Sequence, residues 1–391
     1  MTPRPDRSLR QEYLVFGRPL IGEEEIAEVV ASMRAGWLGT GPKVAEFERR
    51  MAQYKGVKHA VAVNSCTAGL HLSCVGLGIQ PGDEVITTAM TFCATVNAIV
   101  HAGAIPVLAD IDPVSKNIDP DEIRRRITPR TRALLPVHYA GRACDMGAIM
   151  AIAREHNLLV IEDCAHAIET EWHGQRAGTF GNCGVLSFYA TKNIVTGEGG
   201  MILTNDDAVA ARMKNLALHG LSKDAWKRFS DDGYRHYDVV EIGFKYNMMD
   251  LQAAIGMHQC ERIEAMSQRR KELWRRYNEA FADLPIGRPA ALEPDSRHAL
   301  HLYTIEVDPA RCGVERDVFM QTLHRRNIGT GVHYRSIPEY TVYQQRYGWQ
   351  PEEWPHAAWV GRTTVSLPFS AALTDADVED VIFEVRRALR A

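Results

Sequence analysis

The chain has 391 residues, and at roughly 150 residues per domain this length favours two or three structural lobes. It is 46% hydrophobic and 24% charged, so it can bury a large core. A net charge of −4 and a pI near 6.4 argue against a surface for nucleic acid or anionic membranes. No apolar run reaches the roughly 18 residues that span a bilayer, and the charged first residues do not resemble a signal peptide. We therefore predict a cytoplasmic globular protein.

The eight cysteines are irregularly spaced and form no CxxC pair. This pattern argues against a zinc site or an iron–sulfur cluster and predicts reduced thiols, mostly buried or half-buried. No metal site is therefore expected. The cysteines are Cys66, Cys74, Cys93, Cys144, Cys164, Cys183, Cys260 and Cys312.

From about residue 58 to 205, short apolar runs alternate with amphipathic stretches. The predicted strands are 59–63, 84–88, 106–110, 133–137, 158–162 and 185–188. The predicted helices are 68–77, 93–101, 120–127 and 146–155. Strands joined by helices of this length favour right-handed crossovers and a mostly parallel sheet, with ligands at the carboxyl ends of its strands.

The remaining sequence predicts a second, smaller lobe. A long helical pattern over 251–281 leads out of the first lobe. After Pro289, strands at 301–307 and 364–367 and helices at 316–325 and 375–389 indicate an α+β arrangement. We therefore predict an α/β protein with a large domain over 1–260 and a small C-terminal α+β domain over 261–391.

Lys192 is the first candidate catalytic residue. It lies in a short turn after an apolar strand that delivers Ser187, and Gly197, Gly199 and Gly200 follow it. Glycines let the backbone approach a bulky ligand closely. Without the glycines that follow it, Lys192 could equally be a solvated surface charge.

Asp163 supplies a possible partner, because it directly follows the predicted strand over 158–162 and its side chain should reach the same crevice. His166 follows three residues later. A helix N-cap and a surface histidine are the alternative interpretation. A lysine that forms a Schiff base and a carboxylate that holds a pyridine nitrogen protonated are what pyridoxal phosphate requires.

The segment 64–72 follows a strand and opens a helix. Helix N-termini bind phosphate through unpaired N–H groups and the helix dipole. Cys66, Thr67 and Ala68 would supply these donors, although small polar residues begin most helices.

Taken together, eight segments in order resemble the DegT/DnrJ/EryC1/StrS family of pyridoxal-phosphate sugar aminotransferases over nearly the whole chain. They are GWLGTGPK (36–43), NSCTAGLHL (64–72), PGDEVITTAMTF (81–92), PVHYAGRACDM (136–146), IEDCAHAI (161–168), SFYATKNIVTGEGG (187–200), FKYNMMDLQAAIG (244–256) and GTGVHYRS (329–336). The resemblance implies the aspartate-aminotransferase fold, fold type I, and a homodimer with shared active sites.

The resemblance also implies roles for single residues. Lys192 would bind pyridoxal 5′-phosphate covalently, Asp163 would face the pyridine nitrogen, His166 would lie beside the ring, and Phe92 would lie over it. The implied phosphate-binding residues are Cys66, Thr67, Ala68, Ser187 and Asn247, the last from the other subunit.

The resemblance points to a subgroup as well. Most members read Asn-Tyr-Arg where this chain has Lys245-Tyr246-Asn247, and this variant is similar to enzymes that aminate UDP-4-keto-pentose to 4-amino-4-deoxy-L-arabinose. Members also carry a second histidine after the His-Tyr pair, where this chain has Ser336-Ile337-Pro338. The substrate loop therefore differs from that of the subgroup.

The implied reaction moves an amino group from L-glutamate to the 4-keto carbon of a UDP- or dTDP-linked deoxy or pentose sugar, with pyridoxamine phosphate as the intermediate form of the cofactor. Candidate substrate residues are Lys43, Arg235, His333 and Tyr334. Each could also be an ordinary surface or packing residue.

Four other interpretations compete with this one. A 3-keto sugar or keto-inositol aminotransferase would share every cofactor residue named above. A dehydratase of the same family would have histidine in place of Lys192. A non-catalytic regulatory homologue would not need both Lys192 and Asp163. An unrelated Rossmann enzyme would carry a GxGxxG fingerprint, which is absent after the first strand.

Overall fold

The computed structural model describes residues 9–222 and 237–389. A seven-stranded sheet has the order β1-β9-β8-β5-β4-β2-β3. β2, β3, β4, β5 and β8 run parallel, and β9 is antiparallel to both β8 and β1. The prediction of a mostly parallel sheet is therefore confirmed. The strands are β1 (His59–Val63), β2 (Glu84–Thr88), β3 (Ile105–Ala109), β4 (Thr131–Leu135), β5 (Leu159–Cys164), β8 (Cys183–Ser187) and β9 (Gly200–Thr204).

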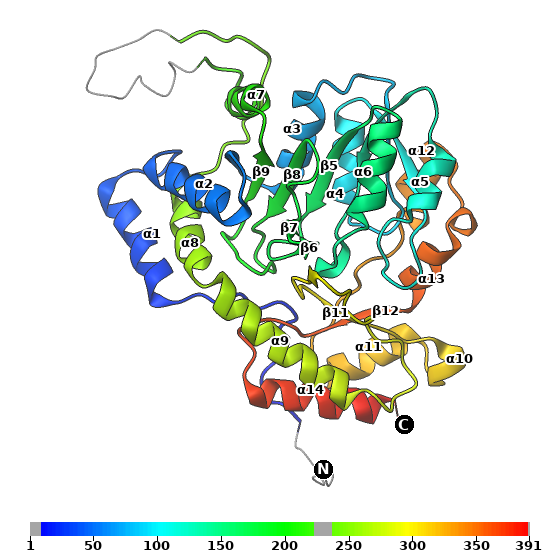
Figure 1. The fold of residues 1–391 in the computed structure, drawn as a ribbon. Helices are drawn as coiled ribbons and strands as arrows, with labels where there is room; N and C mark the ends of the chain where they lie inside the picture. Colours follow the sequence, from blue (N-terminus) through cyan, green and yellow to red (C-terminus); the bar gives the residue numbers. More distant parts are fainter. Residues whose placement is uncertain (1–8, 223–236, 390–391) are drawn as a thin grey trace.

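Helices cover both faces of this sheet (Figure 1). Successive strand residues point to opposite sides, and apolar residues on both sides need to be buried. Val85 packs with α3 and α4, whereas its neighbour Ile86 packs with α5 and α6. Ile161 and Val160 divide in the same way. Strands buried on both faces read as continuous apolar runs, which is what made them predictable. The helices are α3 (Cys66–Gly76), α4 (Cys93–His101), α5 (Pro120–Arg126) and α6 (Met146–Glu155).

Further helices flank the β1 edge of the sheet, and Figure 1 shows α1, α2 and α8 side by side there. The predicted helix over 251–281 is two helices, because the chain turns at Arg262. The sequence reading did not include α1, α2, α7 or β9. The elements are α1 (Glu23–Ala35), α2 (Pro42–Lys55), α7 (Asp207–Ala217), α8 (Asp250–Glu261) and α9 (Ile263–Ala280).

The C-terminal part has a core of its own, in which α9, α11 and α14 pack around the antiparallel pair β11–β12. In contrast, α12 and α13 pack against the large sheet, where Trp354 Nε1 donates to Leu108 O at 2.9 Å. The boundary near residue 260 remains a prediction. The elements are α10 (Pro309–Cys312), α11 (Arg316–Arg325), α12 (Thr341–Tyr347), α13 (Pro355–Thr363), α14 (Asp375–Ala388), β11 (Tyr303–Glu306) and β12 (Thr364–Leu367). A small sheet joins β6 (Glu171–Trp172), β7 (Gln175–Arg176) and β10 (Ser296–Arg297).

Two predictions from composition can be compared with the fold. All eight cysteines are unpaired, and each is buried or half-buried, as expected. Over residues 9–222 and 237–389, no helix is both long and apolar enough to cross a bilayer. The cytoplasmic location remains a prediction.

Candidate active site

Four chain segments meet at the carboxyl ends of the central strands. β5 ends on Asp163 and Cys164, and its parallel neighbour β8 ends on Ser187. β9 begins at Gly200, which pairs with Ser187 and with the last residue of β1. A Cβ at Gly200 would lie 2.5 Å from the carbonyl carbon of Ser65, so glycine is needed for β9 to lie against the start of α3. The predicted phosphate-binding turn is thereby brought close to Ser187.

Asp163 is a buried carboxylate with few fixed donors. Its Oδ2 accepts from the Thr95 hydroxyl at 2.9 Å, and its Oδ1 accepts from the Ala165 N–H at 3.0 Å. Burial raises the pKa of the Asp163 carboxyl, while these hydrogen bonds and the charge of Lys192 oppose the rise. A cationic partner would therefore find a carboxylate that still has free acceptor capacity.

Lys192 lies in the turn after β8, where its N–H donates to Tyr189 O at 2.9 Å. Its side chain is half-buried. Desolvation lowers the pKa of the Lys192 amine to about 8, against the opposing effects of Cys66 and Asp163. Only the unprotonated amine is nucleophilic, so this lysine is far more reactive near neutral pH than an ordinary one.

His166 is held as a neutral imidazole. Its Nδ1 accepts from the Ala140 N–H at 3.2 Å, so the ring proton lies on Nε2. Nε2 lies 2.9 Å from the Tyr334 hydroxyl and donates to it. Burial holds the pKa of His166 well below its usual range, and the charge of Lys192 adds to this effect. The ring orientation is thus fixed from two sides.

Phe92 lies beside Tyr334 and His166 and forms an aromatic cluster with them. It is the N-cap residue of α4 and is 54% exposed, with its ring centroid 5.8 Å from that of Tyr334. Tyr334 in turn stacks on His166 at 5.9 Å. The exposed face of Phe92 is therefore available to a planar ligand beside residues from two other segments.

The start of α3 has the form of an anion site. The Ser65 hydroxyl caps the helix by accepting from the Ala68 N–H at 3.1 Å. The N–H groups of Cys66 and Thr67 belong to the first turn and have no acceptor within the helix. Of the three predicted donors, these two amides are the ones free to bind a phosphate in this conformation.

Asn247 pairs through its backbone with Val63 at the end of β1 of its own chain. Its Nδ2 donates to the Thr40 hydroxyl at 2.7 Å, while its buried Oδ1 has no hydrogen-bond partner among residues 9–222 and 237–389. An unpaired buried amide oxygen is costly and indicates that a donor is missing. The predicted contact with the cofactor of a second subunit remains a prediction.

The structure places two of the four predicted substrate residues at the site. Tyr334 lies at the site through its contact with His166, and His333 lies near enough to feel the charge of Lys192. His333 Nδ1 lies 2.8 Å from Ser366 Oγ, and the Tyr139 hydroxyl donates to the His333 carbonyl. Desolvation lowers the pKa of His333 to about 4, with a further effect of Lys192. Lys43 instead pairs with Glu28 of α1 at 2.5 Å. Arg235 lies outside the described residues.

Sequence reasoning missed four buried polar residues around Lys192 and Asp163. Thr95 follows Phe92 in the first turn of α4, and Asn193 directly follows Lys192. Their positions close to Phe92 and Lys192 in the sequence could have identified these two residues. Glu169 and His301 had none, because their contacts join segments far apart in the sequence. The four residues are Thr95, Glu169, Asn193 and His301.

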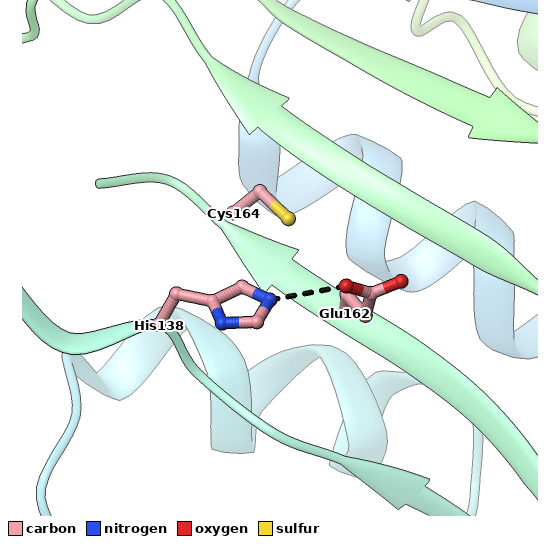
Figure 2. Close-up of side chains that lie close together, drawn as sticks. All are labelled: His138, Glu162 and Cys164. Atoms are coloured by element: carbon pink, nitrogen blue, oxygen red, sulfur yellow. Dashed lines mark hydrogen bonds and ion pairs between the residues drawn. The ribbon is translucent and has the colours of Figure 1, made fainter. Parts of the chain in front are cut away.

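A second buried group, formed by His138, Glu162 and Cys164, has the residue types of a metal site (Figure 2). His138 Nδ1 accepts from the Cys144 N–H at 3.0 Å, so Nε2 carries the proton and donates to Glu162 at 3.1 Å. Glu162 also accepts from three backbone N–H groups, those of residues 178, 180 and 181. Burial raises the pKa of the Cys164 thiol well above its usual range. The histidine and carboxylate lone pairs are committed to hydrogen bonds, so this cluster has a structural role.

The residues at the strand ends fit pyridoxal phosphate. A reactive amine, a buried carboxylate with spare acceptor capacity, an exposed aromatic face and two free helix amides converge on one region. When bound, pyridoxal phosphate supplies an aldehyde that condenses with amines and a ring that withdraws electrons. Each feature of that molecule has a matching group in the chain.

Comparison with known proteins decides the family. The model of the DegT/DnrJ/EryC1/StrS aminotransferase family matches residues 19–386. The chain belongs to this family. It is 47% identical over 378 residues to the spore coat polysaccharide biosynthesis protein SpsC of Bacillus subtilis, covering 96% of this chain and 97% of that protein.

Solved structures of similar proteins agree with this assignment. Spr1654 from Streptococcus pneumoniae, solved in PMP and PLP forms, matches with a TM-score of 0.90 and 32% identity in its PMP form, covering 96% of this chain and 99% of that chain. Helicobacter pylori PseC, an aminotransferase involved in the biosynthesis of pseudoaminic acid, matches with a TM-score of 0.90 and 28% identity, covering 97% and 100%.

These findings confirm several expectations. The fold is that of the fold type I aminotransferases, as predicted. The expected enzyme class, an aminotransferase related to enzymes of sugar biosynthesis, is confirmed at the level of the family. Pyridoxal phosphate as the cofactor is confirmed at the same level.

Proposed function

We propose that this protein transfers an amino group from L-glutamate to the 4-keto carbon of a nucleotide-linked sugar, a UDP- or dTDP-linked deoxy or pentose sugar. The single observation that supports this most is the electrostatic proximity of Lys192, in the turn after β8, to Asp163, at the end of the adjacent strand β5, in a chain of this family. A binding protein without turnover would have no need of a lysine whose pKa is lowered towards neutrality beside a buried carboxylate.

Lys192 and Asp163 divide the chemistry between them. The cofactor aldehyde, when bound, is the electrophile for both the lysine and the donor amine. The unprotonated Lys192 amine would act as the base that takes a proton from the donor Cα. The Asp163 carboxylate would hold the pyridine nitrogen of the cofactor in its protonated form. With the sugar as acceptor, Lys192 would instead deliver the proton to the sugar carbon that gains the amino group.

His166 and Tyr334 orient the ligands without changing charge. Because His166 is neutral and donates from Nε2 to Tyr334, the Tyr334 hydroxyl proton is free to point towards a ligand oxygen. His333, with a pKa of about 4, is also neutral at physiological pH. In our proposal these groups contact the sugar by hydrogen bonds, and the two free amides of α3 hold the cofactor phosphate.

We further propose a homodimer. Large apolar side chains are exposed on α1, just after its end, and in the segment before α8, where Ile242 is 92% exposed. Exposed apolar surface of this kind is typical of association faces. Its members are Ile26, Val30, Met33, Trp37, Leu38, Val239, Val240 and Ile242. Asn247, whose Oδ1 has no partner within the described part of the chain, lies in the same segment as the last three.

The acceptor is tested with the enzyme in its pyridoxamine form. Nucleotide sugars with a keto group at C4 and matched ones with the keto group at C3 are added separately, and the return of the visible absorbance of the lysine-bound cofactor is followed. Restoration by 4-keto compounds alone supports the proposal. Restoration by 3-keto compounds or a keto-inositol alone would establish the alternative activity.

A further inference from the structure

Asn193, the residue after Lys192, is 6% exposed and uses both ends of its side-chain amide. Its Nδ2 donates to the Glu169 carboxylate, at 2.8 and 3.0 Å to the two oxygens, and to Ala299 O at 2.8 Å. Its Oδ1 lies 2.9 Å from His301 Nδ1. The opposite amide orientation would set an oxygen against a carboxylate and a carbonyl, so the hydrogen-bond network fixes this one.

The same contact fixes the tautomer of His301. Because Asn193 Oδ1 can only accept, His301 Nδ1 must carry the ring proton. Burial holds the pKa of His301 well below its usual range, so the ring is neutral. The His301 ring lies 4.4 Å from the His166 ring, centroid to centroid. Asn193 therefore links the Lys192 turn to the imidazole pair at the site.

Glu169 anchors this link from the segment that also carries Asp163 and His166. It is fully buried, and burial raises the pKa of its carboxyl, while the nearby charge of Arg270 and the hydrogen bond from Asn193 oppose the rise. Arg270 Nη1 donates to the carbonyls of Leu300 and His301 at 3.1 and 3.3 Å. Three separate segments, at 169, 193 and 299–301, thus meet at one asparagine amide.

We propose that Asn193, held by Glu169, is a positioning residue that fixes the Lys192 turn and the Nδ1-protonated form of His301. Asn193 and Glu169 together fix the position from which the Lys192 amine reacts with an aldehyde. This inference rests on the proposed role of Lys192. Positional errors of about 1 Å in a catalytic group cost about 100-fold in rate, so the effect of losing the amide should be large.

The test compares Asn193→Leu and Glu169→Ala with Glu84→Ala. Glu84 is also a buried carboxylate, bound by Thr128 and Arg130, but it lies at the opposite end of the sheet, at the start of β2. The apoprotein is mixed with pyridoxal phosphate, reduced with borohydride at timed intervals, and the modified Lys192 peptide is counted by mass spectrometry. We expect capture about 10- to 100-fold slower in both site variants and within about twofold of wild type in Glu84→Ala.

Two measurements distinguish a specific effect on the position of Lys192 from general unfolding of the variants. Glu169→Gln should lose much less than Glu169→Ala, because its side-chain oxygen still accepts from Asn193. In the ¹⁵N-histidine spectrum of the apoprotein, the Nδ1-protonated signal that His301→Gln removes should also be lost or shifted in Asn193→Leu.

Three results would overturn the inference: site variants no slower than Glu84→Ala, Glu169→Gln as slow as Glu169→Ala, or an unchanged histidine signal. Absence of label on Lys192 in the wild-type protein would refute the proposed function instead.

Discussion

Glu162 and Asp163 are neighbours on β5, yet their carboxylates have opposite characters. Alternate strand residues face opposite sides of a sheet, so the two side chains lie in separate environments. Glu162 accepts from three backbone N–H groups and from His138. Asp163 accepts from one N–H and one hydroxyl, and Lys192 is its nearby cation.

In our proposal Asp163 is the functional carboxylate and Glu162 the structural one. Burial alone does not separate them, because both are almost inaccessible to water. The two carboxylates differ in the number of hydrogen-bond donors that the fold directs at them. Glu162 has its acceptor capacity filled by four hydrogen bonds and holds the loop at 178–181, whereas Asp163 accepts two hydrogen bonds from the described part of the chain and keeps capacity for a further donor. Substitutions at and around the two positions should therefore fail in different ways.

The largest effect is expected from Lys192→Ala. Without the amine, the protein should bind pyridoxal phosphate without a covalent bond and lose turnover by about 1,000-fold or more, because the base and the covalent attachment are both removed. Absorbance spectra and rate measurements check this. An unchanged visible band in the variant would contradict the assignment of Lys192.

Asp163→Asn should keep the fold but lower turnover by about 100-fold or more, because a neutral amide no longer holds the proton on the pyridine nitrogen. Its thermal unfolding should stay close to that of the wild type. Turnover near the wild-type rate would contradict the proposed role of Asp163.

Glu162→Gln should behave in the opposite manner. Replacing a carboxylate that accepts four hydrogen bonds leaves donors facing donors, which we expect to cost about 2–4 kcal/mol of unfolding free energy. Activity per folded molecule should change little. Denaturant unfolding together with active-site titration measures both quantities, and a selective loss of activity would break the comparison.

The pH dependence sharpens the contrast further. Since the pKa of Lys192 is about 8, capture of pyridoxal phosphate by the apoprotein should rise about tenfold per pH unit below that value and level off above it. Asp163 raises this pKa, so Asp163→Asn should move the plateau to lower pH, whereas Glu162→Gln should leave it in place. A midpoint near 10.5 would show an ordinary lysine.

The smallest effect concerns the exposed apolar face. Met33, 62% exposed on α1, tests the proposed dimer, and Met33→Glu should weaken association by about tenfold without changing thermal unfolding of the monomer. Sedimentation velocity at several concentrations measures this. A wild-type protein that sediments as a monomer would exclude the shared site.

Local patterns predicted much of the fold and the two central residues. The helix over 93–101 and the strand over 364–367 agree with the structure residue for residue. Asp163 and Lys192 were predicted because parallel strands deliver their last residues to one edge. Even α2 carried an unused signal, with Pro42 in its first turn and Gly56 in the left-handed conformation after its end.

The remaining features depend on contacts between distant segments. Nothing near Glu169 or His301 indicates that both meet Asn193, and nothing near Lys43 indicates its pairing with Glu28. The turn at Arg262 also lies within a continuous helical pattern and coincides with its ion pair to Glu25. Tertiary packing, rather than propensity, decides these points.

The central claim is tested most directly by the absorbance spectrum of the protein loaded with pyridoxal phosphate, before and after addition of L-glutamate. We predict a visible band of lysine-bound cofactor that L-glutamate replaces with the shorter-wavelength band of the pyridoxamine form. A bound cofactor indifferent to L-glutamate would contradict the proposed donor, and the absence of any visible band would contradict the role of Lys192 itself.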